Sequence, residues 1–127
     1  MVNQKEARKL WIDALRSGKY KQTRGWLHNQ NGYCCLGVAC EMYQAEVGDL
    51  VVTNNSGVTF YNDHNELLPT RVQKWLGLTG CDGCFVGDSK RYSSESSLGN
   101  ENDRGCSFAE IADLIESEVD GLIGADK

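Results

Sequence analysis

A single proline, two histidines and the absence of any long apolar run set the first limits on this sequence. Without such a run no helix can cross a membrane, because a crossing needs about 20 apolar residues. The 40% share of hydrophobic residues argues against a disordered or collagen-like chain. The first residues are amphipathic and lack the apolar stretch of a secretory signal, so we expect a cytoplasmic protein without membrane attachment.

Common catalytic motifs are missing as well. The sequence contains no P-loop, no GxGxxG, no HExxH, no GxSxG and no paired-carboxylate signature. These absences favour a non-enzymatic protein and leave an unfamiliar enzyme open. The net charge of −5 argues against nucleic acid as a partner.

The net charge conceals a gradient along the chain. Residues 1–28 carry seven Lys or Arg against two Asp or Glu, whereas residues 101–127 carry two against eight. One interpretation is that the terminal helices pack together with complementary charged edges. The other is that the basic segment presents a face to an anionic ligand.

Hydrophobic periodicity predicts the main elements. Helices are expected over about residues 4–17 and 36–46, in a short segment opened by Leu68-Pro69, and from Ser107 to about 120–123. Hairpins are expected with strands near 24–29 and 33–35 about an Asn31-Gly32 turn, and across residues 50–61. Residues 79–97 have no periodicity and are predicted to form a long loop. The sum is one α+β domain spanning residues 1–127, with three to four helices packed on one or two short antiparallel hairpins.

Six cysteines offer two kinds of chemistry. Cys81 and Cys84 form a CxxC pair that supplies half of a tetrahedral zinc site, so zinc is a possible cofactor. The alternatives are redox chemistry or a local disulfide, and inert loop cysteines. Cys35 is expected near a helix N-terminus, where the helix dipole lowers a thiol pKa. It is therefore the candidate nucleophile of a Cys-dependent hydrolase or transferase. Burial in the core is the competing interpretation.

Two further segments suggest ligand binding. Arg24, Trp26 and His28 would share one face of a strand, where they could stack on and pair with a nucleotide, or simply pack together. Asn102 and Asp103 precede the last helix, where they could clamp a ligand or close a turn through backbone hydrogen bonds.

Four stretches of the chain together resemble a known family. They are WIDALRSGKYKQTRG (11–25), YCCLGVACE (33–41), WLGL (75–78) after Leu68-Pro69, and NDRGCSFAEIADLIE (102–116). In this order they resemble a family of small uncharacterised proteins of tailed bacteriophages and prophages. The CxxC at Cys81 departs from that family's pattern. The resemblance implies a phage accessory protein acting inside an infected bacterium, without an assigned activity or cofactor.

Three functions follow as expectations. The first is a non-enzymatic accessory protein that binds a host protein or other macromolecule and modulates host physiology or defence, with an acidic C-terminal helix suited to a basic surface. The second is a sponge that sequesters a nucleotide-type small molecule through Arg24, Trp26 and the Asn102/Asp103 pair. The third is the Cys35 enzyme.

Overall fold

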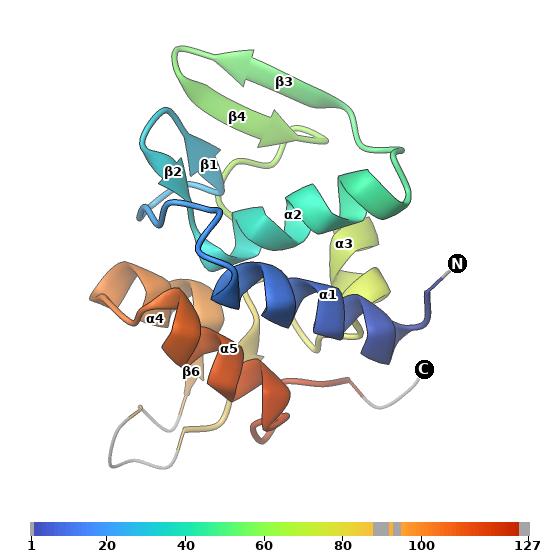
Figure 1. The fold of residues 1–127 in the computed structure, drawn as a ribbon, viewed down its shortest axis with the longest axis vertical. Coiled ribbons are helices and arrows are strands. Elements are labelled where there is room, and N and C mark those ends of the chain that lie inside the picture. The colour runs from blue at the N-terminus through green and yellow to red at the C-terminus, as the bar shows by residue number, and fades with distance from the viewer. Residues whose placement is uncertain (1, 88–91, 93–94, 125–127) are drawn as a thin grey trace.

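The computed structural model describes residues 2–87, 92 and 95–124 (Figure 1). The described elements, in chain order, are α1 (Gln4–Arg16), β1 (His28–Asn29), β2 (Gly32–Tyr33), α2 (Cys35–Glu46), β3 (Val52–Asn55), β4 (Val58–Tyr61), α3 (Thr70–Leu76), β5 (Cys84–Phe85), β6 (Ser96–Ser97), α4 (Leu98–Arg104) and α5 (Phe108–Glu116). The fold is a small single-domain α+β structure, as predicted. None of the helices in the described ranges has the length and apolarity that a bilayer crossing requires.

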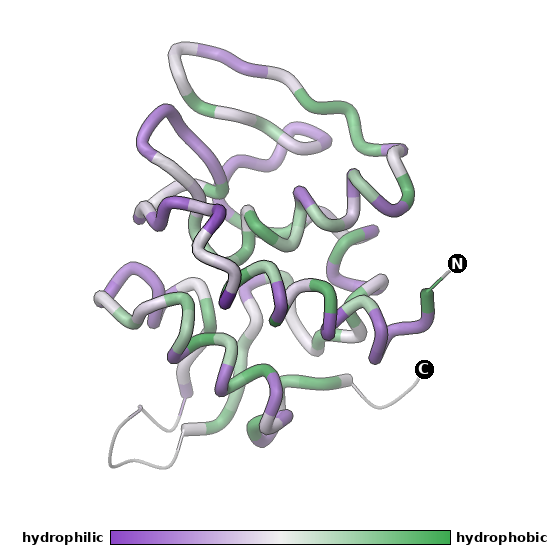
Figure 2. The backbone as a smooth tube through the Cα atoms, in the orientation of Figure 1, coloured by the Kyte–Doolittle hydropathy of each residue, from purple (hydrophilic) through white to green (hydrophobic). Residues whose placement is uncertain are grey.

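Helix α1 organises the core. Asn3 caps it, and the side chain of Glu6 returns to the Asn3 backbone N–H in a capping box. Its apolar stripe is buried against α2, α3 and α5, and Trp11 Nε1 donates to the Cys35 carbonyl at 2.8 Å. Figure 1 shows α1 crossing the middle of the molecule between α2 and α5. In Figure 2 hydrophilic and hydrophobic residues alternate along α1, as one buried face requires.

Helix α2 is enclosed on most sides. Its buried residues are Cys35, Leu36, Gly37, Val38, Ala39, Cys40 and Tyr43. Gly37 is required by close packing, because a Cβ there would overlap the Leu27 carbonyl. The segment before β1 therefore lies directly on the helix.

The two predicted hairpins form one four-stranded sheet in the order β2-β1-β4-β3. Its antiparallel register pairs Asn29 with both Gly32 and Val58, and β3 runs alongside β4. The second hairpin turns at Ser56 and Gly57, which both have positive φ, as a type I′ turn requires. The first hairpin turns at Gln30 and Asn31, neither of which has positive φ, so the predicted Asn31-Gly32 turn is displaced by one residue.

Three sequence predictions are corrected by the fold. Residues 24–27 are irregular, so the first strand is confined to His28–Asn29. The segment predicted as a loop contains the β5–β6 pair, although residues 88–91 and 93–94 lie outside the described residues. The last helix ends at Glu116 because Glu118 adopts a φ of 51° and turns the chain back, so that Thr79 N–H donates to the Leu122 carbonyl at 2.9 Å.

Candidate functional site

The structure separates the three residues predicted to share a face. Arg24 is exposed and Trp26 is half-buried in the irregular segment before β1. The His28 ring stacks on Tyr33 with a centroid distance of 3.7 Å, and its Nδ1 lies 2.7 Å from the Gly32 carbonyl oxygen. Because these residues are not on one strand, the alternation argument for a shared face is wrong.

Trp26 lies at the edge of a cavity of about 240 Å³, which we call the Trp26 pocket. The pocket is formed where residues 25–26, 34–36, 66–67, 82 and 97–103 meet. Three carboxylates line it, from Glu66, Asp82 and Asp103. Negative charge of this kind opposes a phosphate group. The nucleotide hypothesis stays a prediction, and the three carboxylates near Trp26 argue against it.

Asn102 lies in α4, in place of the predicted turn, and has no exposed surface. Its Oδ1 accepts hydrogen bonds from Gln22 Nε2 at 2.8 Å and from the Cys35 N–H at 3.2 Å. Its Nδ2 donates to the Thr23 carbonyl at 2.8 Å. These bonds join α4, the N-terminus of α2 and the segment after α1, so the side chain is occupied by the protein itself.

Asp103 is exposed and reaches the Trp26 pocket. Its Oδ1 accepts a hydrogen bond from the Gly25 N–H at 3.0 Å. Of the two predicted clamp residues, the structure therefore places only Asp103 where a ligand could touch it.

Cys35 begins α2, as its predicted position near a helix N-terminus requires, but it has no exposed surface. Its Sγ donates to the Leu98 carbonyl at 3.5 Å. Burial raises the pKa of the Cys35 thiol well above its ordinary value, and it raises that of Cys34 to about 11. The expected lowering of the Cys35 pKa by the helix dipole is thus overturned by desolvation, which leaves the thiol neutral at pH 7.

Cys81 and Cys84 are half-buried at the β5–β6 pair. Burial, and then the nearby Asp82 carboxylate, raise the pKa of the Cys84 thiol. Among the described residues no group of three His, Cys, Asp or Glu side chains is arranged to hold a metal ion. The zinc hypothesis stays a prediction, with two candidate ligands from this pair.

Basic residues near the start of the chain pair with acidic residues near its end. Arg16 near the start of the chain pairs with Asp113 at 2.7 Å and with Glu116 at 2.9 Å. Arg8 pairs with Glu118 at 3.6 Å. The terminal helices therefore pack with complementary charged edges, as the first interpretation of the gradient predicts.

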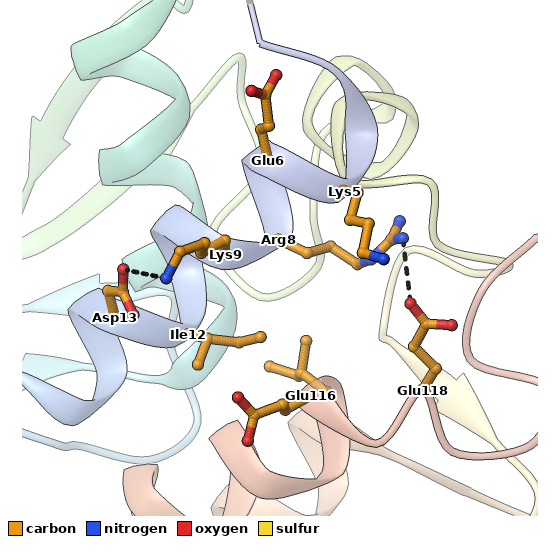
Figure 3. A pocket seen from close by; sticks show the side chains of 9 residues that line it. Lys5, Glu6, Arg8, Lys9, Ile12, Asp13, Glu116 and Glu118 are labelled. Carbon is orange, nitrogen blue, oxygen red and sulfur yellow. Dashed lines mark hydrogen bonds and ion pairs between the residues drawn. The ribbon is translucent and has the colours of Figure 1, made fainter.

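A second cavity lies between α1 and α5, with a volume of about 380 Å³; we call it the α1/α5 groove (Figure 3). It is lined by Lys5, Glu6, Arg8, Lys9, Ile12, Asp13, Ile115, Glu116 and Glu118. Ile12 and Ile115 supply apolar surface, and both are largely buried. Lys5 and Lys9 belong to the α1 wall of the groove. Glu116 is the last residue of α5, and Glu118 follows it.

Sequence reasoning missed the α1/α5 groove as a site. Lys5, Lys9 and Ile12 follow one another at i, i+4 and i+7, so they lie along one side of α1. This spacing on α1 was the one signal in the sequence that could have pointed to the groove. The opposite wall comes from residues about one hundred positions later in the chain, and only the tertiary packing reveals it.

The fold and the groove define a small α+β domain with a concave helix–helix surface. A family model covers residues 3–119, and the chain belongs to the family described as Domain of unknown function (DUF8296). No curated protein and no solved structure matches the chain significantly.

Proposed function

We propose that the chain is a non-enzymatic, phage-type accessory protein that binds a host protein through the α1/α5 groove in the host cytoplasm. Binding would modulate host physiology or defence. The observation that carries this proposal is the groove itself, which combines an apolar base with an α1 wall that carries charges of both signs and an opposite wall that carries Glu116 and Glu118. The resemblance of the sequence to phage and prophage proteins supports the bacterial setting.

The charges of the groove specify the partner. An apolar side chain of the host protein would pack on the base formed by Ile12 and Ile115, and burying it would contribute about 2 kcal/mol. A carboxylate beside it would meet Lys5 and Lys9. A basic side chain of the partner would meet Glu116 and Glu118 on the other wall. The partner is therefore an amphipathic segment with charged residues of both signs next to its apolar face.

The walls of the groove are held in place before any partner binds. Arg8 is buried, and its Nη1 donates to the Leu76 carbonyl at 2.7 Å while its Nη2 pairs with Glu118. Lys9 Nζ lies 3.4 Å from Asp13 Oδ2. Figure 3 marks this pair with a dashed line. A preorganised surface loses less conformational entropy on binding, which favours affinity.

Site-specific photocrosslinking tests the proposal. A photoreactive amino acid at the position of Lys9 would be compared with the same amino acid at Lys19, which is exposed outside the groove. We expect one host protein to be crosslinked in bacterial lysate from position 9 and not from position 19. Equal crosslinking at both positions, or none at position 9, would contradict the proposal.

Charge reversal gives a second, matched comparison. The Lys5→Glu/Lys9→Glu double variant changes the groove, and Lys19→Glu/Lys21→Glu makes the same charge change on exposed residues that do not line it. The first double variant should abolish capture of the crosslinked host protein, whereas the second should retain it. If the groove variant still captures the host protein, the groove is not the binding surface.

A further inference from the structure

Among the residues that the structure describes, no strand pairs with the outer side of β3, which forms an open edge of the four-stranded sheet. Strand β3 pairs with β4 on one side, and all four of its residues are exposed. Figure 1 shows the β3–β4 hairpin at one end of the molecule, with β3 on its outer side. An edge of this kind presents unpaired backbone groups to any extended chain that approaches it.

The register identifies those backbone groups. Antiparallel pairs alternate between hydrogen-bonded and non-hydrogen-bonded types, and the pair that closes a two-residue turn is hydrogen-bonded. Asn55 and Val58 close the turn at Ser56–Gly57, so Thr53 and Asn55 bond to β4. The N–H and C=O groups of Val52 and Asn54 therefore point to the outer side.

The edge lacks the features that usually prevent strand pairing. Residues 50–61 include no charged residue and no proline, in a chain whose charged fraction is 24%. Val51 and Val52 are 66% and 44% exposed. Natural edge strands are commonly protected by a lysine, a proline or a bulge, and β3 has neither of the first two.

We propose that β3 pairs with β3 of a second copy of this chain, in antiparallel orientation, to form a homodimer. Two-fold symmetry places Thr53 opposite Thr53, and Val52 opposite Asn54 of the second copy. The two outward residues of each strand then form about four main-chain hydrogen bonds across the interface. The sheets of the two copies become one continuous sheet.

A second copy is the occupant for which the structure supplies both halves of the interface. The open edge can pair with an extended strand. Strand β3 of a second copy is such a strand, and it carries no charged residue. Two chains of net charge −5 repel each other over most of their surfaces, so an uncharged edge is where they can approach. The α1/α5 groove lies on other elements, so each copy would keep its groove open.

Sedimentation equilibrium over a range of concentrations tests the dimer. The wild-type chain should move from 14.1 kDa toward twice that mass as its concentration rises. Val52→Lys should weaken the dimer by about tenfold or more, because it places like charges on the two edges. Val86→Lys is the matched control, since Val86 is 50% exposed outside the β3–β4 hairpin and should leave the dimer unchanged.

Disulfide trapping tests the register independently. Thr53→Cys should form an intermolecular disulfide under mild oxidation faster than Asn55→Cys, because the symmetric pairing brings the two copies of residue 53 together. The wild-type chain is the control, because it shows how much crosslinking the six native cysteines cause. A chain that stays monomeric at millimolar concentration, or a dimer that Val52→Lys does not weaken, would overturn the proposal.

Discussion

Arg16 donates to both carboxylate oxygens of Glu116, from Nη1 at 3.2 Å and from Nη2 at 2.9 Å. This two-pronged contact joins the end of α1 to the end of α5. A planar guanidinium matches a carboxylate in this geometry better than an ammonium group does. The basic first quarter and the acidic last quarter of the chain are therefore partners within the fold.

We predict that Arg16→Gln lowers the free energy of unfolding modestly at low salt, because the contact is solvent-exposed. The difference from the wild type should shrink in high salt, as screening weakens the pairs. Lys19→Gln removes an exposed charge outside this contact and serves as the control. Urea denaturation at two salt concentrations measures the effect. A salt-independent difference would show that packing of the arginine stem matters more than its charge.

The same contact predicts a pH dependence in the acid range. Hydrogen bonding to Arg16 lowers the pKa of Glu116, so the stabilisation is present above the ordinary carboxyl pKa of about 4.3. It is lost as pH falls and Glu116 becomes protonated. The stability difference between the wild type and Arg16→Gln should therefore narrow below that pH. Denaturation curves that stay equally separated down to low pH would contradict this.

Asn102→Ala should be far more damaging than the loss of a surface ion pair. It leaves the buried Cys35 N–H and the Thr23 carbonyl without their side-chain partner, at a cost of about 3 kcal/mol in the free energy of unfolding. Asn100→Ala is the matched control, since it changes an exposed asparagine in the same helix and should cost less than about 0.5 kcal/mol. Chemical denaturation monitored by tryptophan fluorescence measures both. If the two variants lose the same free energy of unfolding, the buried hydrogen bonds of Asn102 are not important for stability.

The cysteines should react in two groups. Cys34, Cys35 and Cys40 are buried, whereas Cys81, Cys84 and Cys106 are partly accessible. Brief alkylation of the native protein near pH 8 should therefore modify the second group first, because a buried neutral thiol is a poor nucleophile. Peptide mass spectrometry identifies the modified positions, and alkylation in denaturant should modify all six. Rapid native labelling of Cys35 would restore it as a candidate nucleophile.

Stability should decline in alkaline solution. Burial raises the pKa of Cys34 to about 11, above the ordinary thiol value of about 8.5. The unfolded chain thus loses its protons first, so the stabilisation is complete below about pH 8.5 and is lost as pH rises toward 11. Tyr61 adds to the decline, since burial and then its hydrogen bond to Glu41 raise its pKa. Cys34→Ala should flatten part of the slope in denaturation curves measured from pH 7 to 11.

Local signals in the sequence identified the elements that depend on local interactions. The capping boxes at Asn3 and Ser107 are each completed within four residues, so the helices that they begin could be predicted from the local sequence. The hairpin at Ser56–Gly57 was found for the same reason. The α+β class follows from these elements.

Tertiary contacts decided the elements that were missed. Helix α4 reads LGNENDR, which includes a glycine and two asparagines with low helix propensity. It is stabilised by the Ser97 cap, by the buried Asn102 and by the left-handed Gly105 at its end. The candidate groove was missed for a related reason, because its two walls come from opposite ends of the chain.

The pairing of α1 with α5 also sets an order of events during synthesis. Helix α1 is translated before α5, yet part of the surface that covers its apolar stripe and the carboxylates that hold Arg16 belong to α5. This contact can form only after residues 113–116 have left the ribosome. Until then the stripe containing Trp11 and Leu15 is only partly covered, and a nascent chain stalled before α5 would be a target for chaperones and proteases.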